Sequence, residues 1–146
     1  MKQPYTIQFD HLANEIVTEA YIFPAFTKGT LPPLKYFTHY AAWDTGSEQT
    51  IISPELAEAL QLTSIGREPI GGIGGCQEAD VYRVAIGLPN GHVLYNLKVC
   101  CLPIEHYELL LGMDIIKKCD FAITNQDGRT TFSFQTPSST TIDFKK

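Results

Sequence analysis

Residues 36–47 read YFTHYAAWDTGS, and this stretch decides how the chain can be interpreted. An aromatic, apolar strand runs into Asp44, so its carboxylate is expected at the rim of the core. Thr45 can hold the following loop by hydrogen bonding, and Gly46 lets another backbone approach closely. Ser47 can donate a hydrogen bond to a carboxylate. Because Asp and Gly are also common in surface turns, this motif alone is a weak indication of function.

Two glycine-containing segments follow in the chain. Residues 70–75 read IGGIGG, and so many glycines suit a hairpin tip that moves or approaches a ligand, although a flexible surface loop is the simpler interpretation of this segment alone. Residues 109–114 read LLLGMD, a buried strand that enters a turn or helix through a glycine; alone, this pattern fits ordinary core packing. The candidate residues in these two segments are Gly71, Gly72, Ile73, Gly74, Gly75, Leu110, Leu111 and Gly112.

Length and composition predict one domain. The chain has 146 residues, of which 44% are apolar and 18% charged, so disorder is disfavoured. The net charge of -5 argues against nucleic acid as a partner. No apolar run approaches the ~18 residues of a membrane helix, and acidic residues interrupt the N-terminus where a secretory signal would lie. We therefore expect no membrane partner and, taking Met1 as the true start, a cytoplasmic location.

Strand patterns dominate the chain and predict an all-β fold, a barrel-like sheet with one or two short helices. Asn90-Gly91 and the segment 125–128 predict hairpin turns, because Asn and Gly tolerate positive φ. Ser53-Pro54-Glu55 predicts the start of a helix, since Ser caps, Pro suits the first position and Glu suits the positive end of the helix dipole. A second helical turn is expected at 114–118. The predicted strands are 16–23, 35–43, 81–88, 92–101, 121–124 and 131–134.

The sequence predicts the structure of the two ends of the chain less specifically. Residues 1–34 can form an arm, an extra hairpin or a dimer-contacting element. Residues 136–141 read TPSSTT and predict a mobile polar connector, after which 142–144 could dock as a terminal strand. The single domain is thus expected to contain an N-terminal arm or extra strands (1–34), a core (36–135) and a polar tail (136–146).

Several kinds of site are not indicated. Cys76, Cys100, Cys101 and Cys119 form no CxxC pair and no zinc-type spacing with histidine, so we expect buried or inert thiols, no metal and no cofactor. A redox role for the adjacent Cys100 and Cys101 is a weaker alternative. The glycines of 71–75 do not fit a dinucleotide-binding motif and no phosphate-binding loop occurs, so nucleotide binding is disfavoured.

Taken together and in this order, the three motifs resemble those of the retroviral-type aspartic proteases, the retropepsin family. Asp44-Thr45-Gly46-Ser47 is similar to the family's D-T-G-[SA] motif, and 70–75 resembles the flap tip of its viral members. Leu110-Leu111-Gly112 is similar to the motif before the family's C-terminal helix. The resemblance covers roughly residues 36–135 and implies a retropepsin-like barrel with a flap hairpin.

The resemblance also implies an activity and roles for individual residues. It assigns the catalytic acid to Asp44, a contact across a dimer axis to Thr45 and a substrate contact to Gly46. It implies that the backbone N–H of Ile73 orders a water above the substrate. The mechanism needs two carboxylates that share a proton, and the chain has one D-T-G, so the resemblance implies a homodimer that cleaves a peptide or protein substrate without a metal.

Some positions depart from the family pattern and keep alternatives open. The viral enzymes usually have Arg where this chain has Met113, so Glu48 lacks the partner expected for it. A non-catalytic dimerisation or peptide-binding module with the same fold is the alternative function. If the chain is an enzyme, we expect Ser47 to favour the charged carboxylate of the site and to draw activity toward acidic pH.

Overall fold

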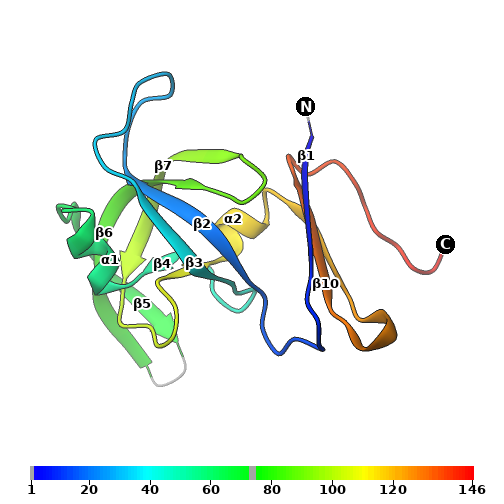
Figure 1. Ribbon diagram of the computed structural model, residues 1–146. Coiled ribbons are helices and arrows are strands. Elements are labelled where there is room, and N and C mark those ends of the chain that lie inside the picture. The colour runs from blue at the N-terminus through cyan, green and yellow to red at the C-terminus, as the bar shows by residue number, and fades with distance from the viewer. Residues whose placement is uncertain (1, 73–74) are drawn as a thin grey trace.

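The computed structural model describes residues 2–72 and 75–146 and is built mainly of strands (Figure 1). Its described part contains two short α-helices and one 3₁₀ turn, which confirms the predicted fold class. In chain order the elements are β1 (Gln3–Gln8), β2 (Val17–Pro24), β3 (Tyr36–Trp43), β4 (Ile51–Ile52), α1 (Pro54–Ala59), β5 (Gly66–Gly72), β6 (Gly75–Gly87), β7 (Val93–Cys101), β8 (Leu109–Leu111), α2 (Met113–Ile116), β9 (Asp120–Thr124), η1 (Gln126–Gly128) and β10 (Thr131–Thr136).

Seven strands form the larger sheet, in the order β2-β3-β8-β4-β7-β6-β5. The end of the long strand β6 also pairs with β2, so the sheet curls back on itself into a barrel. Side chains that alternate along these strands point inward and are buried, as expected for strands with one face on the core. The largest fully buried side chains include Ile22, Ile52, Leu56, Val84, Ile86, Val99, Leu109, Leu111 and Ile115.

Local sequence signals explain the turns and helices. Ser53 Oγ accepts a hydrogen bond from Leu56 N at 3.1 Å, which caps α1 as predicted. Gly91 has a φ of +91° and closes the β6–β7 hairpin, while Asp127 and Gly128 have φ values of 59° and 73° between β9 and β10. Both predicted hairpins are confirmed because these residue types tolerate the left-handed region.

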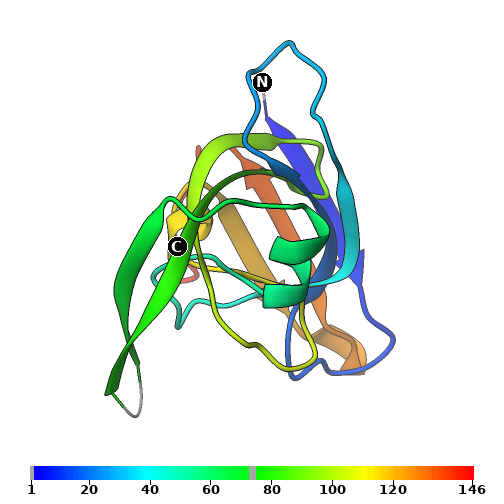
Figure 2. The ribbon, with the colours of Figure 1, turned by 90° about the vertical axis from the view of Figure 1, so that its left-hand side faces the viewer.

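The N-terminal segment contains strands β1 and β2, which belong to different sheets and so do not form the extra hairpin that was one possibility for residues 1–34. Strand β1 pairs with β10 along its whole length, from Gln3 opposite Thr136 to Gln8 opposite Thr131. With β9 these strands make a three-stranded sheet beside the barrel (Figures 1 and 2). Trp43 packs between the two sheets, with its ring centroid 4.9 Å from that of Phe134. The small sheet therefore supports strand β3, which ends just before Asp44.

The C-terminal tail differs from the sequence prediction. Residues 137–146 contain no strand, so the terminal strand expected at 142–144 is not formed. The start of the tail is tied down instead: the Asp120 carboxylate accepts hydrogen bonds from the backbone N–H groups of Ser139 and Thr140 at 2.7 and 2.9 Å. No helix in the described part of the chain is long and apolar enough to span a membrane.

Candidate functional site

The end of strand β3 places Asp44 beside the end of strand β8. The two strands run parallel, with Trp43 opposite Leu111, and the backbone N–H of Asp44 donates to the Leu111 carbonyl at 2.9 Å. Consequently the Asp44 loop and the start of α2 leave the sheet side by side. Two motifs more than sixty residues apart in the sequence, D-T-G-S and L-L-G, thereby form one structural unit.

The loop after β3 is a tight turn built on the side chain of Asp44. Its Oδ1 atom accepts a hydrogen bond from Gly46 N at 2.9 Å, and its carbonyl accepts one from Ser47 N at 3.3 Å. An aspartate that binds the backbone two residues ahead fixes such a turn in place. Asp44 is half-buried in this arrangement, whereas Thr45 and Gly46 are exposed.

Ser47 makes a different contact from the one predicted. Its hydroxyl donates to the carbonyl of Gln49 at 2.6 Å. A serine hydroxyl has a single hydrogen to donate, so Ser47 does not donate to the Asp44 carboxylate. The expected acidic shift of activity through Ser47 therefore loses its structural basis, and the residue instead stabilises the loop.

Gly112 explains why the loop fits against α2. A Cβ atom at this position would lie 2.6 Å from both the C and O atoms of Gln49 and 2.9 Å from the carbonyl oxygen of Ser47. The close approach lets Met113 N donate to Ser47 O at 2.7 Å and Asp114 N donate to Glu48 O at 3.2 Å. Any side chain at position 112 would force this backbone apart.

The sequence analysis missed a second connection, made by Asp114 and Thr50. The buried Thr50 donates to the Asp114 carboxylate twice, through its hydroxyl at 2.7 Å and its backbone N–H at 3.0 Å. The same hydroxyl accepts a hydrogen bond from Gly112 N at 3.1 Å. An acid two residues after the glycine of a strand-to-helix junction was the available signal, but its partner becomes visible only in three dimensions.

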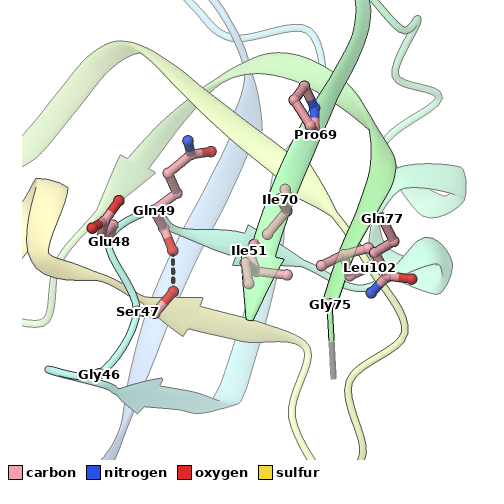
Figure 3. A pocket seen from close by; sticks show the side chains of 11 residues that line it. Gly46, Ser47, Glu48, Gln49, Ile51, Pro69, Ile70, Gly75, Gln77 and Leu102 are labelled. Atoms are coloured by element: carbon pink, nitrogen blue, oxygen red, sulfur yellow. Dashed lines mark hydrogen bonds between the residues drawn. The ribbon is translucent and has the colours of Figure 1, made fainter. Parts of the chain in front are cut away.

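A cleft of about 560 Å³ opens between this loop and the β5–β6 hairpin (Figure 3). Gly46 and Ser47 line it on one side, while Gly71 and Gly75 line it on the other, so the first two predicted motifs face the same space. The predicted residues Ile73 and Gly74 lie outside the described residues. The sequence analysis had also named Glu48 and, within 70–75, Ile70, both of which line the cleft. It did not identify the remaining lining residues, which are Gln49, Ile51, Pro69, Gln77 and Leu102.

The cysteines are separate free thiols with different surroundings. Cys100 is fully buried and donates to the Gln49 side-chain oxygen at 2.7 Å, and Cys76 is exposed. Burial raises the pKa of Cys100 and Cys101, and it raises the pKa of Cys119 to about 11. Since the thiolate is the reactive form, these shifts weigh against a redox role for Cys100 and Cys101. Among residues 2–72 and 75–146, no three His, Cys, Asp or Glu side chains gather to hold a metal ion.

Comparisons with known proteins agree with this geometry. A family model described as "gag-polyprotein putative aspartyl protease" matches residues 38–118, more than half of the chain. The matched region contains the Asp44 loop, the β5–β6 hairpin and the Gly112 junction. No curated protein sequence gives a significant match.

The chain is also similar to solved structures. A retropepsin-like aspartic protease from Rickettsia conorii superposes with a TM-score of 0.53 at 13% identity, over 93% of this chain and 96% of that one, a likeness that concerns the fold alone. The EIAV protease in complex with the inhibitor HBY-793 gives a TM-score of 0.48 at 22% identity, over 73% and 88% of the two chains. The Simian Foamy Virus (mac) protease gives a TM-score of 0.44 at 25% identity, over 70% of this chain and 92% of that one.

Proposed function

Because the chain belongs to the gag-polyprotein aspartyl protease family, we propose that it is an aspartic endopeptidase that acts as a homodimer. The observation that carries this proposal is the Asp44 loop, which the Gly112 junction holds rigidly at the edge of a cleft. A binding module would not need an acid held in this way. Catalytic groups, by contrast, must be kept in a fixed geometry by the structure around them.

The number of catalytic acids is the reason for proposing a dimer. Aspartic proteases use two carboxylates that share one proton, because two like charges a few ångströms apart cannot both ionise. This chain has one Asp-Thr-Gly sequence. A second copy related by a two-fold axis would supply the second Asp44. The exposed position of Thr45 next to it is suited to a contact across that axis.

In the proposed dimer, a water molecule lies between the two Asp44 carboxylates. The ionised carboxylate takes a proton from the water as its oxygen attacks the carbonyl carbon of the peptide bond. The protonated carboxylate gives its proton to the carbonyl oxygen, and a tetrahedral diol forms. When the C–N bond breaks, the carboxylate that took the water proton gives it to the leaving nitrogen, and a diol hydroxyl gives its proton to the other carboxylate, so that the two carboxylates again share one proton. No covalent bond to the enzyme forms in this sequence.

The β5–β6 hairpin would act as the flap of this enzyme. Its strands pair in register up to Gly72 opposite Gly75, and both Gly71 and Gly75 line the cleft. An extended peptide could add to the cleft wall as a strand, with its backbone providing affinity and its alternate side chains entering apolar pockets. Ile51, Ile70 and Leu102 supply the apolar surface for such side chains.

The central test is cleavage of a mixed peptide library between pH 3 and pH 7. We expect the wild type to cleave and Asp44→Asn to lose at least ~100-fold in rate, since the general acid–base step is removed. Asp127→Asn is the matched control, because Asp127 is exposed in the turn between β9 and β10 and should leave the rate unchanged. Equal cleavage by the wild type and Asp44→Asn would overturn the proposal. Peptide binding without cleavage by either protein would overturn it too and support the non-catalytic module.

A further inference from the structure

One lining residue gives the cleft its charge. Among the described residues that line it, Glu48 is the only one with a charged side chain, and the others are apolar residues, glycines, Ser47 or the amides Gln49 and Gln77. Glu48 is exposed and lies at the opposite end of the cleft from Gln77 and Leu102 (Figure 3). Among the described lining residues, only Glu48 can therefore discriminate between ligands by their charge, whereas Asp44 at the edge of the cleft meets the scissile bond itself in the proposed mechanism.

The backbone of Glu48 is fixed although its side chain extends into solvent. Its carbonyl accepts the N–H of Asp114 at 3.2 Å, and the carbonyl of the preceding Ser47 accepts the N–H of Met113 at 2.7 Å. Helix α2 thus holds the residue in place at the cleft. Because this backbone is already ordered, only the freedom of the Glu48 side chain is lost when the residue binds a ligand.

The Glu48 carboxylate is not neutralised within the described part of the chain. Among residues 2–72 and 75–146, no ion pair involves the Glu48 side chain. Near the base of the β5–β6 hairpin, Lys98 binds Glu68 at 2.9 Å and Arg67 binds Asp80 at 3.2 Å, so both cations already have acidic partners. Met113, whose backbone contacts the loop, brings no charge.

We infer that Glu48 makes the cleft selective for peptides that carry a lysine or arginine at a position flanking the pair of residues between which cleavage occurs. A carboxylate attracts such cations and repels glutamate and aspartate, and the chain's net charge of -5 acts in the same direction. This inference rests on the proposed function. In the proposed homodimer, the second Glu48 lies on the other side of the two-fold axis, so basic residues are favoured on both sides of the scissile bond.

The test compares peptides that differ only in charge. A library with an apolar pair at the cleavage point carries Lys, Gln or Glu at each flanking position. For the wild type we expect kcat/KM to be about 5- to 10-fold higher for Lys than for Glu at the position that Glu48 reaches. Glu48→Gln should bring this ratio close to one and Glu48→Lys should invert it. Glu58→Gln, an exposed acid on α1, is the matched control and should leave the ratio unchanged.

The measured quantity is the ratio of kcat/KM for the Lys peptide to kcat/KM for the Glu peptide. A general loss of activity lowers both values and leaves this ratio unchanged. A ratio near one in the wild type, or a ratio that Glu48→Gln leaves intact, would overturn the inference. If the wild type cleaves no peptide, the proposed function fails, and binding of the labelled Lys and Glu peptides to Asp44→Asn by fluorescence anisotropy then decides the inference separately. Tighter binding of the Lys peptide that Glu48→Gln abolishes would support it, and equal or absent binding would overturn it.

Discussion

Gly112 is the residue on which the geometry of the Asp44 loop depends. Its φ is not in the left-handed region, so conformational freedom is not the reason for a glycine here. The reason is contact: the backbone of Ser47 and Gln49 occupies the space that a side chain would need. Any larger residue would push the loop away from α2 and weaken the hydrogen bond between Met113 N and Ser47 O.

We expect Gly112→Ala to lower the free energy of unfolding by about 1–3 kcal/mol, the range for overpacking a tight site. The obstructing atoms belong to the backbone and cannot rotate away as a flexible side chain would. Urea denaturation measures the effect. Gly71→Ala is the matched control, because no atom lies within 4 Å of a Cβ at that position, and its effect should stay within about 0.5 kcal/mol. Equal stability of the two variants would show that the loop can move aside.

At the scale of elements, Asp120 joins the small sheet to the C-terminal tail. It begins strand β9, and its carboxylate accepts hydrogen bonds from Gln135 on β10 and from Ser138, Ser139 and Thr140 in the tail. These hydrogen bonds hold the pKa of Asp120 well below its usual range, with that from the Ser138 hydroxyl contributing most. The start of the tail is therefore held by hydrogen bonds to the charged Asp120 carboxylate and not by pairing as a strand.

Asp120→Ala should release the tail without unfolding the sheet. We expect amide hydrogen exchange at Ser139 and Thr140 to accelerate roughly tenfold, because both amides lose the carboxylate that accepts their hydrogen bonds. In Asp127→Asn, the control, exchange at both amides should be unchanged. Exchange that is equally fast in the wild type would contradict this role of Asp120.

The pH dependence of the same exchange follows from the lowered pKa. A group whose pKa is lowered on folding stabilises the folded form above its unfolded pKa, and this contribution is lost as the pH falls through the folded value. Protection of the Ser139 and Thr140 amides should therefore persist at pH ~4, where a free aspartate is half protonated. Loss of protection near that pH would mean that Asp120 is not held in its charged form.

At the scale of the whole molecule, the chain forms its terminal sheet by itself. Strand β1 is fully paired with β10 of the same chain, and β9 covers the other side of β10. The N-terminal segment thus completes this sheet within one chain, and strand β1 needs no second copy for its pairing. In the proposed homodimer, the association would rest on other surfaces, among them the exposed Thr45 beside Asp44.

Subunit mixing tests the proposed dimer directly. When wild type is mixed with an equal amount of Asp44→Asn and allowed to re-associate, activity should fall to about one quarter of that of the same total amount of wild type, because only dimers with two intact carboxylates act. Wild type diluted with an unrelated protein to the same extent is the control and should keep about half. If the mixture with Asp44→Asn also keeps about half of the wild-type activity, each chain acts alone.

Local chemistry alone determined a good part of this protein. Asn90-Gly91 predicted its hairpin because those residues accept positive φ, and Ser53-Pro54 predicted the start of α1 because serine caps a helix. The order of the three motifs indicated the family, which the family model bears out, and the alternating apolar strands indicated the fold class. Each turn signal, helix signal and motif lies within a few consecutive residues, and the order of the motifs can be seen along the chain without knowledge of the fold.

The tertiary structure decided what depends on surfaces that meet across long stretches of chain. The parallel pairing of β3 with β8 brings Gly112 against Gln49, and the same packing joins Thr50 to Asp114. It also turned the hydroxyl of Ser47 toward a backbone carbonyl and left residues 142–144 without a strand. Such contacts follow from which strands pair, because a donor or an edge binds whichever partner the fold brings to it, and no local pattern specifies that partner.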